Sequence, residues 1–425
     1  MSLPKANCSF AIPSIHDDLE LDCRLYYPRI TEQTIQLFGK SFAIVAHPYA
    51  PLGGSYDDPV VRLAGSALLQ CGCILATFNF RGASGSAGRT SWTGKAELGD
   101  YVSVYGFILC YIDALYRSMV EGGSGWTSVP PVLILGGYSY GSIIASHLPP
   151  TDIIAALWES PLPGTAESEI RLRAVDLSRD TKAYLDSHMF PITPSSPQNR
   201  GGYGEDAKRP NRGAIVGGYE SDAASRRVGR ESSGRSIDGD RVRQSIDRVR
   251  RKISPRVGPS PGSDRKGQTA VPALLLPSVA YVLISPLLPP VAGFTTMFSK
   301  LKFTRKGRDT GPQREEYHEL AVHPCCCLFG SRDVFTSDRK LQRWTADLAS
   351  RPGSRFTAIR VNAAGHFWHE DEDSVRLRRG LAEWLRTLTP SEEDAKETDI
   401  VPQSARHADG SNEQHKLEGT TVRTG

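Results

Sequence analysis

Ser139 lies in the pentapeptide 137–141, Gly-Tyr-Ser-Tyr-Gly, where a serine hydroxyl could act as a nucleophile. Such a run matters only where an apolar strand precedes it and a helix follows, because a sharp turn must lift the hydroxyl above the edge of a sheet. Residues 131–136 form an apolar run typical of a strand, and the chain from 141 onward is typical of a helix. The sequence therefore favours a nucleophilic Ser139 over the alternative, a plain turn between a strand and a helix.

A serine at neutral pH needs a histidine base that is itself oriented by a carboxylate. Asp333 follows an apolar run at 325–329, and His366 follows the last predicted strand in a Gly-His-Phe sequence. Both lie where open parallel sheets place their ligand crevice, so they are the predicted acid and base. Asp338 and His369 are nearby alternatives. Asp338 is expected on the next helix, and His369 opens an acidic run typical of the first turn of a helix.

The intermediate of acyl transfer carries an oxyanion that needs backbone N–H donors. Tyr140, directly after the serine, is the first predicted donor. The second is expected in the loop 47–54, and because Pro48 has no N–H, Tyr49 is the predicted donor there. The alternative is that this loop is a proline- and glycine-rich turn without a catalytic role.

Strands and helices alternate around these residues. Two extended runs, 9–13 and 19–27, flank a polar turn and predict an antiparallel hairpin. Further strands are predicted at 41–46, 73–79, 131–136, 280–284, 325–329 and 355–361, and helices at 58–70, 97–119, from 141 onward and at 374–388. The strands are nearly unbroken apolar runs, as expected when helices cover both faces of a parallel sheet. We therefore expect an α/β fold with a mostly parallel central sheet, helices on both faces and an N-terminal antiparallel hairpin.

Five motifs occur in one order along the chain: a His-Pro loop at 47–54, the loop Asn-Phe-Arg-Gly-Ala-Ser-Gly-Ser-Ala-Gly at 79–88, the pentapeptide 137–141, the loop of Asp333 and the final Gly-His-Phe. In this set the chain resembles an intracellular serine hydrolase branch of the α/β-hydrolase superfamily, over about 9–190 and 270–390. The resemblance implies the α/β-hydrolase fold, with a triad in the order serine, aspartate, histidine.

The same resemblance implies supporting roles for residues in the two early loops. His47 belongs to the first loop, and Asn79, Arg81 and Gly82 belong to the second. Ser84 stands where the family pattern has a glycine, so the second loop is expected to turn differently here.

Two apolar segments compete for the sixth strand, 153–158 and 280–284, and a Ser-Pro-Leu sequence comes soon after each. The later segment better resembles the corresponding segment of the family. We therefore favour it, which leaves 151–189 as an added helical segment that could cover the site.

Residues 191–268 are rich in Gly, Ser, Arg and Pro and poor in large apolar side chains. Such a composition buries too little surface to offset the entropy of ordering. We predict a disordered basic low-complexity insert at 191–268 between the two parts of one hydrolase domain, 1–190 and 269–390, and a disordered tail at 391–425. A short basic amphipathic helix in the insert could instead contact an acidic membrane surface or a protein partner. A translated intron in an imperfect gene model is the remaining alternative.

The charge of the chain is unevenly distributed. The insert holds 17 Lys/Arg and 9 Asp/Glu, so the remainder carries 34 against 38 and is slightly acidic. A nucleic-acid reader would carry its positive charge on the folded surface that meets the phosphates. We therefore expect no nucleic-acid partner.

Location and metal content are predicted from local patterns. The N-terminus has no apolar core after a basic start, so we expect no signal peptide and a cytoplasmic protein. Eight cysteines lack the spacing of a disulfide framework or a zinc site and are expected to be buried reduced thiols, with no metal. The longest apolar stretch, 270–294, is interrupted by prolines, so no transmembrane segment is expected.

These features predict a serine hydrolase that acts on a small acyl substrate, a carboxylic ester or thioester, without a cofactor. A peptidase or amidase would use the same residues, because the substrate pocket sets the preference for the leaving group. A non-catalytic binding protein of this fold is the third hypothesis, and the presence of Ser139, Asp333 and His366 argues against it.

Overall fold

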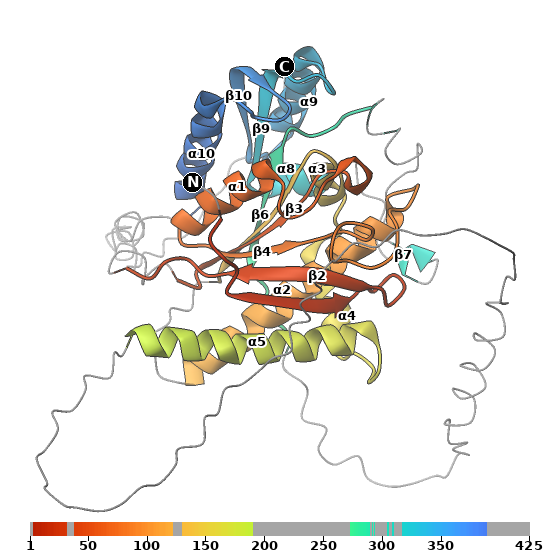
Figure 1. Cartoon of the computed structure of the whole chain (residues 1–425), viewed down its shortest axis with the longest axis vertical. Coiled ribbons are helices and arrows are strands. Elements are labelled where there is room, and N and C mark those ends of the chain that lie inside the picture. The colour runs from red at the N-terminus through yellow and green to blue at the C-terminus, as the bar shows by residue number, and fades with distance from the viewer. Residues whose placement is uncertain are drawn as a thin grey trace, which may run out of the picture. The chain divides into compact units, whose positions relative to one another are not determined.

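The computed structural model contains an eight-stranded sheet with the strand order β1-β2-β4-β3-β5-β6-β9-β10 (Figure 1). The strands are β1 (Cys8–Pro13), β2 (Glu20–Tyr26), β3 (Ser41–Ala46), β4 (Ile74–Phe78), β5 (Val132–Tyr138), β6 (Ser278–Ile284), β9 (Cys325–Arg332) and β10 (Phe356–Gly365). Strand β2 pairs antiparallel with β1 and β4, and every other neighbouring pair in this sheet is parallel. The predicted fold class, with its mostly parallel sheet and N-terminal antiparallel hairpin, is confirmed.

The structure describes residues 3–31, 38–121, 130–189, 273–289 and 317–388, together with 291, 293, 304–305 and 308–309. Contacts group 1–192 with 271–425 as one unit and 193–270 as a second unit. The predicted insert at 191–268 and the predicted tail at 391–425 lie outside the described residues. Their disorder therefore stays a prediction.

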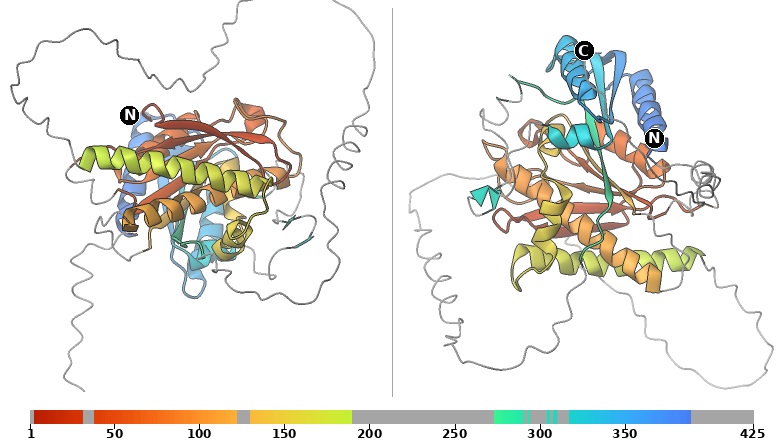
Figure 2. Two further views of the ribbon diagram at one scale, coloured as in Figure 1. Left: turned by 90° about the horizontal axis from the view of Figure 1, so that it is seen from below. Right: turned by 180° about the vertical axis from the view of Figure 1, so that it is seen from behind.

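Helices cover both faces of the sheet (Figures 1 and 2). They are η2 (Ala50–Leu52), α1 (Pro59–Gln70), α2 (Lys95–Glu121), α3 (Tyr140–Ser146), α4 (Thr151–Trp158), α5 (Ala166–Met189), α8 (His318–Val322), α9 (Asp338–Ser350) and α10 (Asp371–Arg386). Helices α1 and α10 pack together over one core cluster, and helices α2, α3, α4, α5 and α9 contribute to the other. A short antiparallel pair, β7 (Thr304–Arg305) and β8 (Arg308–Asp309), is separate from the main sheet.

The two core clusters follow from the side-chain alternation of the strands. In β3, Phe42 and Ile44 belong to the larger cluster, whereas Ala43 and Val45 belong to the smaller one. Successive side chains of a strand point to opposite faces, so a strand that is apolar throughout needs cover on both sides. This explains why the unbroken apolar runs of the sequence became central strands.

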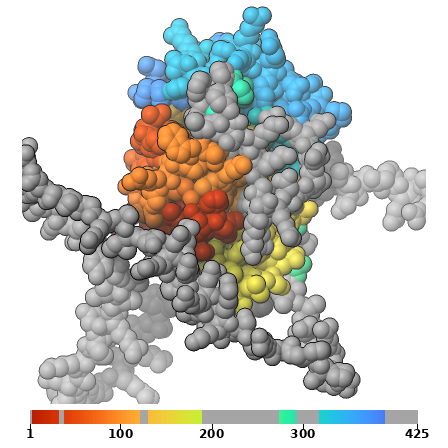
Figure 3. Space-filling model, turned by 90° about the vertical axis from the view of Figure 1, so that its right-hand side faces the viewer, coloured from red at the N-terminus to blue at the C-terminus, as the bar shows by residue number. Residues whose placement is uncertain are grey.

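Figure 3 shows one side of the molecule, where surfaces of the N-terminal part (orange), the α4 region (yellow) and the C-terminal elements (blue) are exposed.

The later of the two candidate segments forms the sixth strand of the sheet. Strand β6 includes 280–284, and 153–158 lies instead within helix α4. Helix α5 packs along α2 and beside β1. Figures 1 and 2 show it running along the outside of α2, away from α3. The expectation that this added segment covers the site is therefore wrong for α5, because its apolar residues pack on α2.

All eight cysteines are free, and six of them are buried. Cys325, Cys326 and Cys327 follow one another in β9, so the first and third enter the larger core cluster and the second enters the smaller one. Burial raises the pKa of each of these thiols well above its ordinary range. They therefore behave as small apolar core residues.

One helix of the described residues, Lys95–Val120 within α2, is long and apolar enough to cross a membrane by length and composition. However, 94% of its apolar window is buried inside the structure. Buried side chains such as Tyr101 and Phe107 account for this apolar composition by their place in the core. The predictions on membrane contact, nucleic acid and cellular location are not tested by the fold.

Candidate functional site

Ser139 occupies the sharp turn between β5 and α3. Its backbone angles are φ 55° and ψ −112°, a combination that costs free energy in an L-residue and persists only where the surroundings enforce it. The Ser139 N–H donates to the carbonyl oxygen of Ile284 at 2.9 Å, which ties the turn to the end of β6. The turn therefore holds the hydroxyl at the carboxyl ends of the parallel strands.

The two glycines that flank this turn are required by the close approach of the chain. A Cβ on Gly137 would lie 2.3 Å from the carbonyl carbon of Gly141. A Cβ on Gly141 would lie 2.5 Å from the carbonyl oxygen of Ala46. Any larger residue would push α3 away from the sheet, so the spacing of the pentapeptide has a steric cause.

The imidazole of His366 lies between Ser139 and Asp333. Its Nε2 is 2.9 Å from Oγ of Ser139, and its Nδ1 is 2.7 Å from Oδ2 of Asp333. His366 is 2% exposed, and the Asp333 carboxylate is fully buried. An ionised carboxylate can only accept, so Nδ1 carries the proton and Nε2 is left to accept from the serine hydroxyl.

Backbone donors fix the Asp333 carboxylate. Its Oδ1 accepts from the N–H of Phe335 at 2.8 Å and from the N–H of Thr336 at 3.0 Å. This turn aims the other oxygen, Oδ2, at His366. The structure thus brings three residues together that are separated by up to 227 positions in the chain.

The alternative acid and base lie in other environments. Asp338 begins α9, and its carboxylate forms an ion pair with Arg360 at 2.7 Å. His369 is exposed and stacks on the ring of Phe367. His366 thus binds Asp333 and Ser139, whereas Asp338 accepts from the exposed Arg360 and from Gln342.

Three aromatic rings surround His366, and sequence reasoning missed them. Ring centroids lie 5.4 Å away for Tyr138, 4.6 Å for Phe335 and 5.3 Å for Phe367. The Tyr138 hydroxyl also donates to the carbonyl oxygen of His366 at 3.2 Å. Each of these aromatic residues lies within two positions of a predicted triad residue, and this proximity was the available signal.

A second pair of residues missed in the sequence anchors the histidine loop. The indole Nε1 of Trp368 donates to Oγ of Ser285 at 3.0 Å, and both side chains are buried. Ser285 directly follows β6, and Trp368 lies two residues after His366. This bond therefore holds the loop of the base against the end of a central strand.

The predicted oxyanion donors, Tyr49 and Tyr140, are neighbours in space. Their ring centroids are 5.1 Å apart at a near-perpendicular angle. Tyr140 is the first residue of α3, so its N–H has no acceptor within the helix. Tyr49 caps η2, and its carbonyl oxygen accepts from Leu52 and Gly54, which folds the loop back on itself.

His47 joins the two early loops. Its Nε2 accepts from the N–H of Phe80 at 2.8 Å, and its Nδ1 donates to the carbonyl oxygen of Pro48 at 2.5 Å. The tautomer follows from the Phe80 donor, which requires an unprotonated Nε2. Burial lowers the pKa of His47 to about 4, so the ring is neutral at pH 7. Both ring nitrogens of His47 are thus bonded to the backbone, which ties the first early loop to the second.

Asn79 and Gly82 shape the second loop. The Asn79 side chain accepts from the N–H of Tyr56 at 2.8 Å and donates to the carbonyl oxygen of Ser84. Gly82 has φ 76°, in the left-handed region. Ser84 thus contributes its backbone carbonyl to this loop.

Arg81 links the N-terminal hairpin to α2. Its buried guanidinium pairs with Asp100 at 2.7 Å and with Asp17 at 2.9 Å. Burial opposes the charge of Arg81, but the two carboxylates outweigh it and raise the pKa of the guanidinium. Asp100 is fully buried, so this pair is a fixed part of the interior.

Within the described part of the chain, no group of three or more His, Cys, Asp or Glu side chains could hold a metal ion. The prediction that the chemistry needs no metal or cofactor therefore stays a prediction.

No family model and no curated protein matches the chain. Solved structures do match. An α/β serine hydrolase without a lid from Xanthomonas campestris is 13% identical, with a TM-score of 0.42 over 92% of this chain and 99% of that one. An esterase from Pyrococcus furiosus is 11% identical, with a TM-score of 0.39 over 89% and 90%. A propionate-bound thermophilic esterase from Thermogutta terrifontis is 9% identical, with a TM-score of 0.40 over 94% and 98%. The chain is structurally similar, at low sequence identity, to α/β serine hydrolases and esterases.

Proposed function

We propose that the protein is a serine hydrolase that cleaves carboxylic esters or thioesters through an acyl-enzyme. The observation that carries the proposal is a pair of hydrogen bonds that links Ser139, His366 and Asp333. Nε2 of His366 is 2.9 Å from the serine Oγ, and Nδ1 is 2.7 Å from Oδ2 of Asp333. A buried carboxylate at Nδ1 orients the imidazole and stabilises the imidazolium that forms when Nε2 takes the serine proton.

The proposed reaction has two halves. Ser139 Oγ attacks the carbonyl carbon while His366 accepts its proton, and the N–H groups of Tyr49 and Tyr140 stabilise the oxyanion. The intermediate collapses, and His366 gives the proton to the departing alcohol or thiol. A water molecule then attacks the acyl-enzyme with His366 as base, and the carboxylic acid leaves.

Exposed apolar side chains on the loops around the triad support an apolar acyl or alkyl group in the substrate. Leu52 is 80% exposed, Val334 77%, Phe367 47% and Phe335 37%. The rings of Phe335 and Phe367 lie 5.9 Å apart, centroid to centroid. Apolar surface grouped beside a few convergent polar groups is typical of a small-molecule site.

A fluorophosphonate probe tests the proposal directly, because it reacts covalently with an activated serine. We expect the wild-type protein to be labelled, and Ser139→Ala and His366→Gln to remain unlabelled. Ser146→Ala and His369→Gln, which change the same residue types outside the triad, should be labelled like wild type. A folded wild-type protein that stays unlabelled would remove the catalytic proposal and favour a non-catalytic binding protein.

The peptidase or amidase alternative needs a comparison of leaving groups. We would compare p-nitrophenyl esters of acetate, butyrate and octanoate with p-nitroanilides of the same acids. The proposal predicts faster turnover of the esters and a preference for the longer acyl chains. Faster cleavage of an anilide than of its matched ester would replace the esterase assignment with an amidase.

A further inference from the structure

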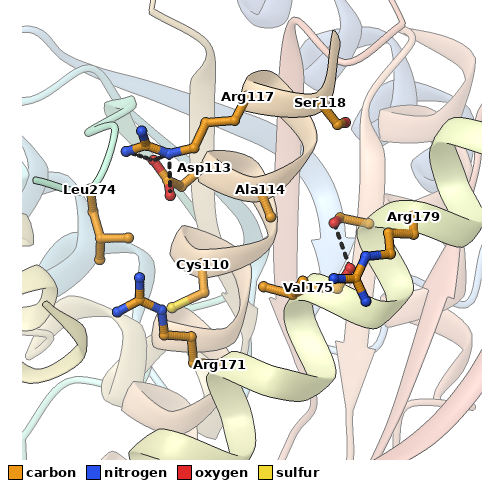
Figure 4. Close-up of a pocket in the computed structure, with 10 residues that line it drawn as sticks. Cys110, Asp113, Ala114, Arg117, Ser118, Arg171, Val175, Arg179 and Leu274 are labelled. Atoms are coloured by element: carbon orange, nitrogen blue, oxygen red, sulfur yellow. Dashed lines mark hydrogen bonds and ion pairs between the residues drawn. The ribbon is translucent and has the colours of Figure 1, made fainter. Parts of the chain in front are cut away.

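A cavity of about 360 Å³ opens between α2 and α5 (Figure 4). Its lining includes Cys110, Ala114 and Arg117 from α2, Arg171 and Val175 from α5, and Leu274 from the chain that leads into β6. No residue of the candidate triad or of the loops 47–54 and 79–88 lines this cavity. The cavity is therefore separate from the candidate catalytic site.

The wall at Leu274 is held in place by polar contacts to α2. Oδ1 of Asp113 accepts from the N–H of Leu275 at 3.0 Å. Arg117 donates to the carbonyl oxygen of Ala273 at 3.0 Å and forms an ion pair with Asp113 at 2.8 Å. Arg117 and Asp113 thus pair with each other and with the backbone at 273 and 275. These contacts hold the wall of the cavity that contains Leu274.

Arg171 differs from the other arginines of the lining. From one nitrogen it donates to the carbonyl oxygens of Trp158 and Glu159, at 2.9 and 3.0 Å. Arg117 and Arg179 each have a carboxylate partner, whereas Arg171 has no ion pair within the described ranges of the chain. A half-buried guanidinium with neutral partners retains donors and charge for an anion.

Among the uncharged residues of the lining, Ser118 and Ser178 are polar and the others present mostly apolar surface. Ala114, Val175 and Leu274 contribute methyl groups and short alkyl chains. Burial raises the pKa of the Cys110 thiol to about 12 despite the nearby Arg171 charge, so the thiol stays protonated. Figure 4 shows Arg171 beside Cys110, with Leu274 on the same side of α2 as the guanidinium. Of the three guanidinium groups in the lining, the one without an ion pair in the described ranges therefore lies next to the apolar chamber formed by Ala114, Val175 and Leu274.

We propose that this cavity binds a small amphiphilic carboxylate. The carboxylate pairs with the guanidinium of Arg171, whose planar fork fits two carboxylate oxygens. The apolar body contacts Ala114, Val175 and Leu274, which an inorganic anion would leave without a partner. The proposal does not rest on the hydrolase function, because the cavity shares none of its residues.

Isothermal titration of hexanoate into the full-length protein tests the proposal, with hexanamide as the uncharged analogue at equal ionic strength. We expect hexanoate to bind at least tenfold more tightly than hexanamide. Arg171→Gln should weaken hexanoate binding at least tenfold. Arg173→Gln, which removes an exposed arginine two residues away on the same helix, should leave it within twofold of wild type.

A second variant keeps Arg171 and fills the chamber instead. Ala114→Leu should also weaken hexanoate binding at least tenfold, and thermal unfolding checks that both variants remain folded. Failure of wild type to bind hexanoate, equal binding of hexanamide, or unchanged binding in Ala114→Leu would each overturn the proposal. Binding of inorganic phosphate as tight as that of hexanoate would also overturn it, because the apolar chamber would then contribute nothing.

Discussion

Ser139 lies between two sets of loops that are held in different ways. The loops 47–54 and 79–88 contain buried polar groups that bind one another and the backbone, such as His47 with Phe80 and Arg81 with Asp100. Both partners of each contact belong to the protein, so the contacts form without a substrate. The backbone of this side is therefore fixed before any ligand arrives.

The loops 333–336 and 366–369 carry Asp333 and His366, the proposed acid and base. Here aromatic rings enclose the imidazole, and two of them, Phe335 and Phe367, are partly exposed. The first set of loops thus mainly fixes backbone geometry, including that of the proposed donor Tyr49, and the second combines the proposed acid and base with aromatic surface. Substitutions in the first set should act mainly on stability, and those in the second set mainly on activity.

The largest effect is expected in the second set, from His366→Gln. Without the base, kcat for a p-nitrophenyl ester should fall by roughly four to six orders of magnitude, while the urea midpoint changes little. His369→Gln is the matched control and should retain kcat within about twofold, since His369 is exposed and stacks on Phe367. A comparable loss in both variants would mean that the wrong histidine has been assigned.

The next largest effect belongs to the first set. Arg81→Met leaves Asp100 buried without its guanidinium, and breaking such a pair costs about 3–5 kcal/mol of the free energy of unfolding. Urea denaturation measures this loss. Arg89→Met, at an exposed position of the same loop region, should change the free energy of unfolding little. If the two variants were equally stable, the Arg81 pairs would not be what fixes these loops.

His47 gives the first set of loops a dependence on pH. Its pKa is about 4 in the folded protein against 6.5 for an unperturbed histidine, so the unfolded chain binds the proton more readily. The contribution of neutral His47 to the free energy of unfolding is complete above about pH 6.5 and is lost as the pH falls toward 4. Between pH 7 and pH 4.5 the free energy of unfolding should therefore fall by about 2 kcal/mol. The measurement is the free energy of unfolding of wild type and His47→Gln across this range. Parallel profiles for the two proteins would contradict the assignment.

The smallest effect concerns the aromatic surface of the second set. Phe335→Ala removes a ring that contacts His366 and Phe367, and kcat/KM for the octanoate ester should fall about tenfold. The acetate ester, which reaches less of this surface, should lose less. Leu172→Ala, at an exposed apolar position of α5, is the control. Equal losses for both esters would show that Phe335 positions the imidazole and does not bind the acyl chain.

Much of the sheet could be predicted from the sequence because its strands are apolar on both faces. The bounds of β3 match the prediction, and β4, β5 and β6 differ by at most two residues at either end. The segment 153–158 remained open, since a short apolar run is compatible with a buried strand and with a helix. The resemblance favoured 280–284, and the pairing of β6 with β5 and β9 confirms this choice.

The candidate triad could be found from motif order, but its surroundings could not. The link from Arg81 to Asp17 joins residues 64 positions apart, and nothing in either local pattern indicates it. The same holds for Trp368 and Ser285, which are 83 positions apart. Such contacts depend on how the loops cross, and local propensity does not determine that.

The three consecutive cysteines of β9 give the protein an internal reporter of unfolding. Strand β9 is paired on both sides, with β6 and β10, and a thiol reacts as a thiolate that has reached solvent. Alkylation of Cys325, Cys326 and Cys327 therefore requires the sheet to come apart, whereas Cys8 and Cys71 are half-buried and can react after local opening. Mass spectrometry of the alkylated cysteines would thus separate fraying at the edges from opening of the whole domain, in the unmodified protein and without any added label.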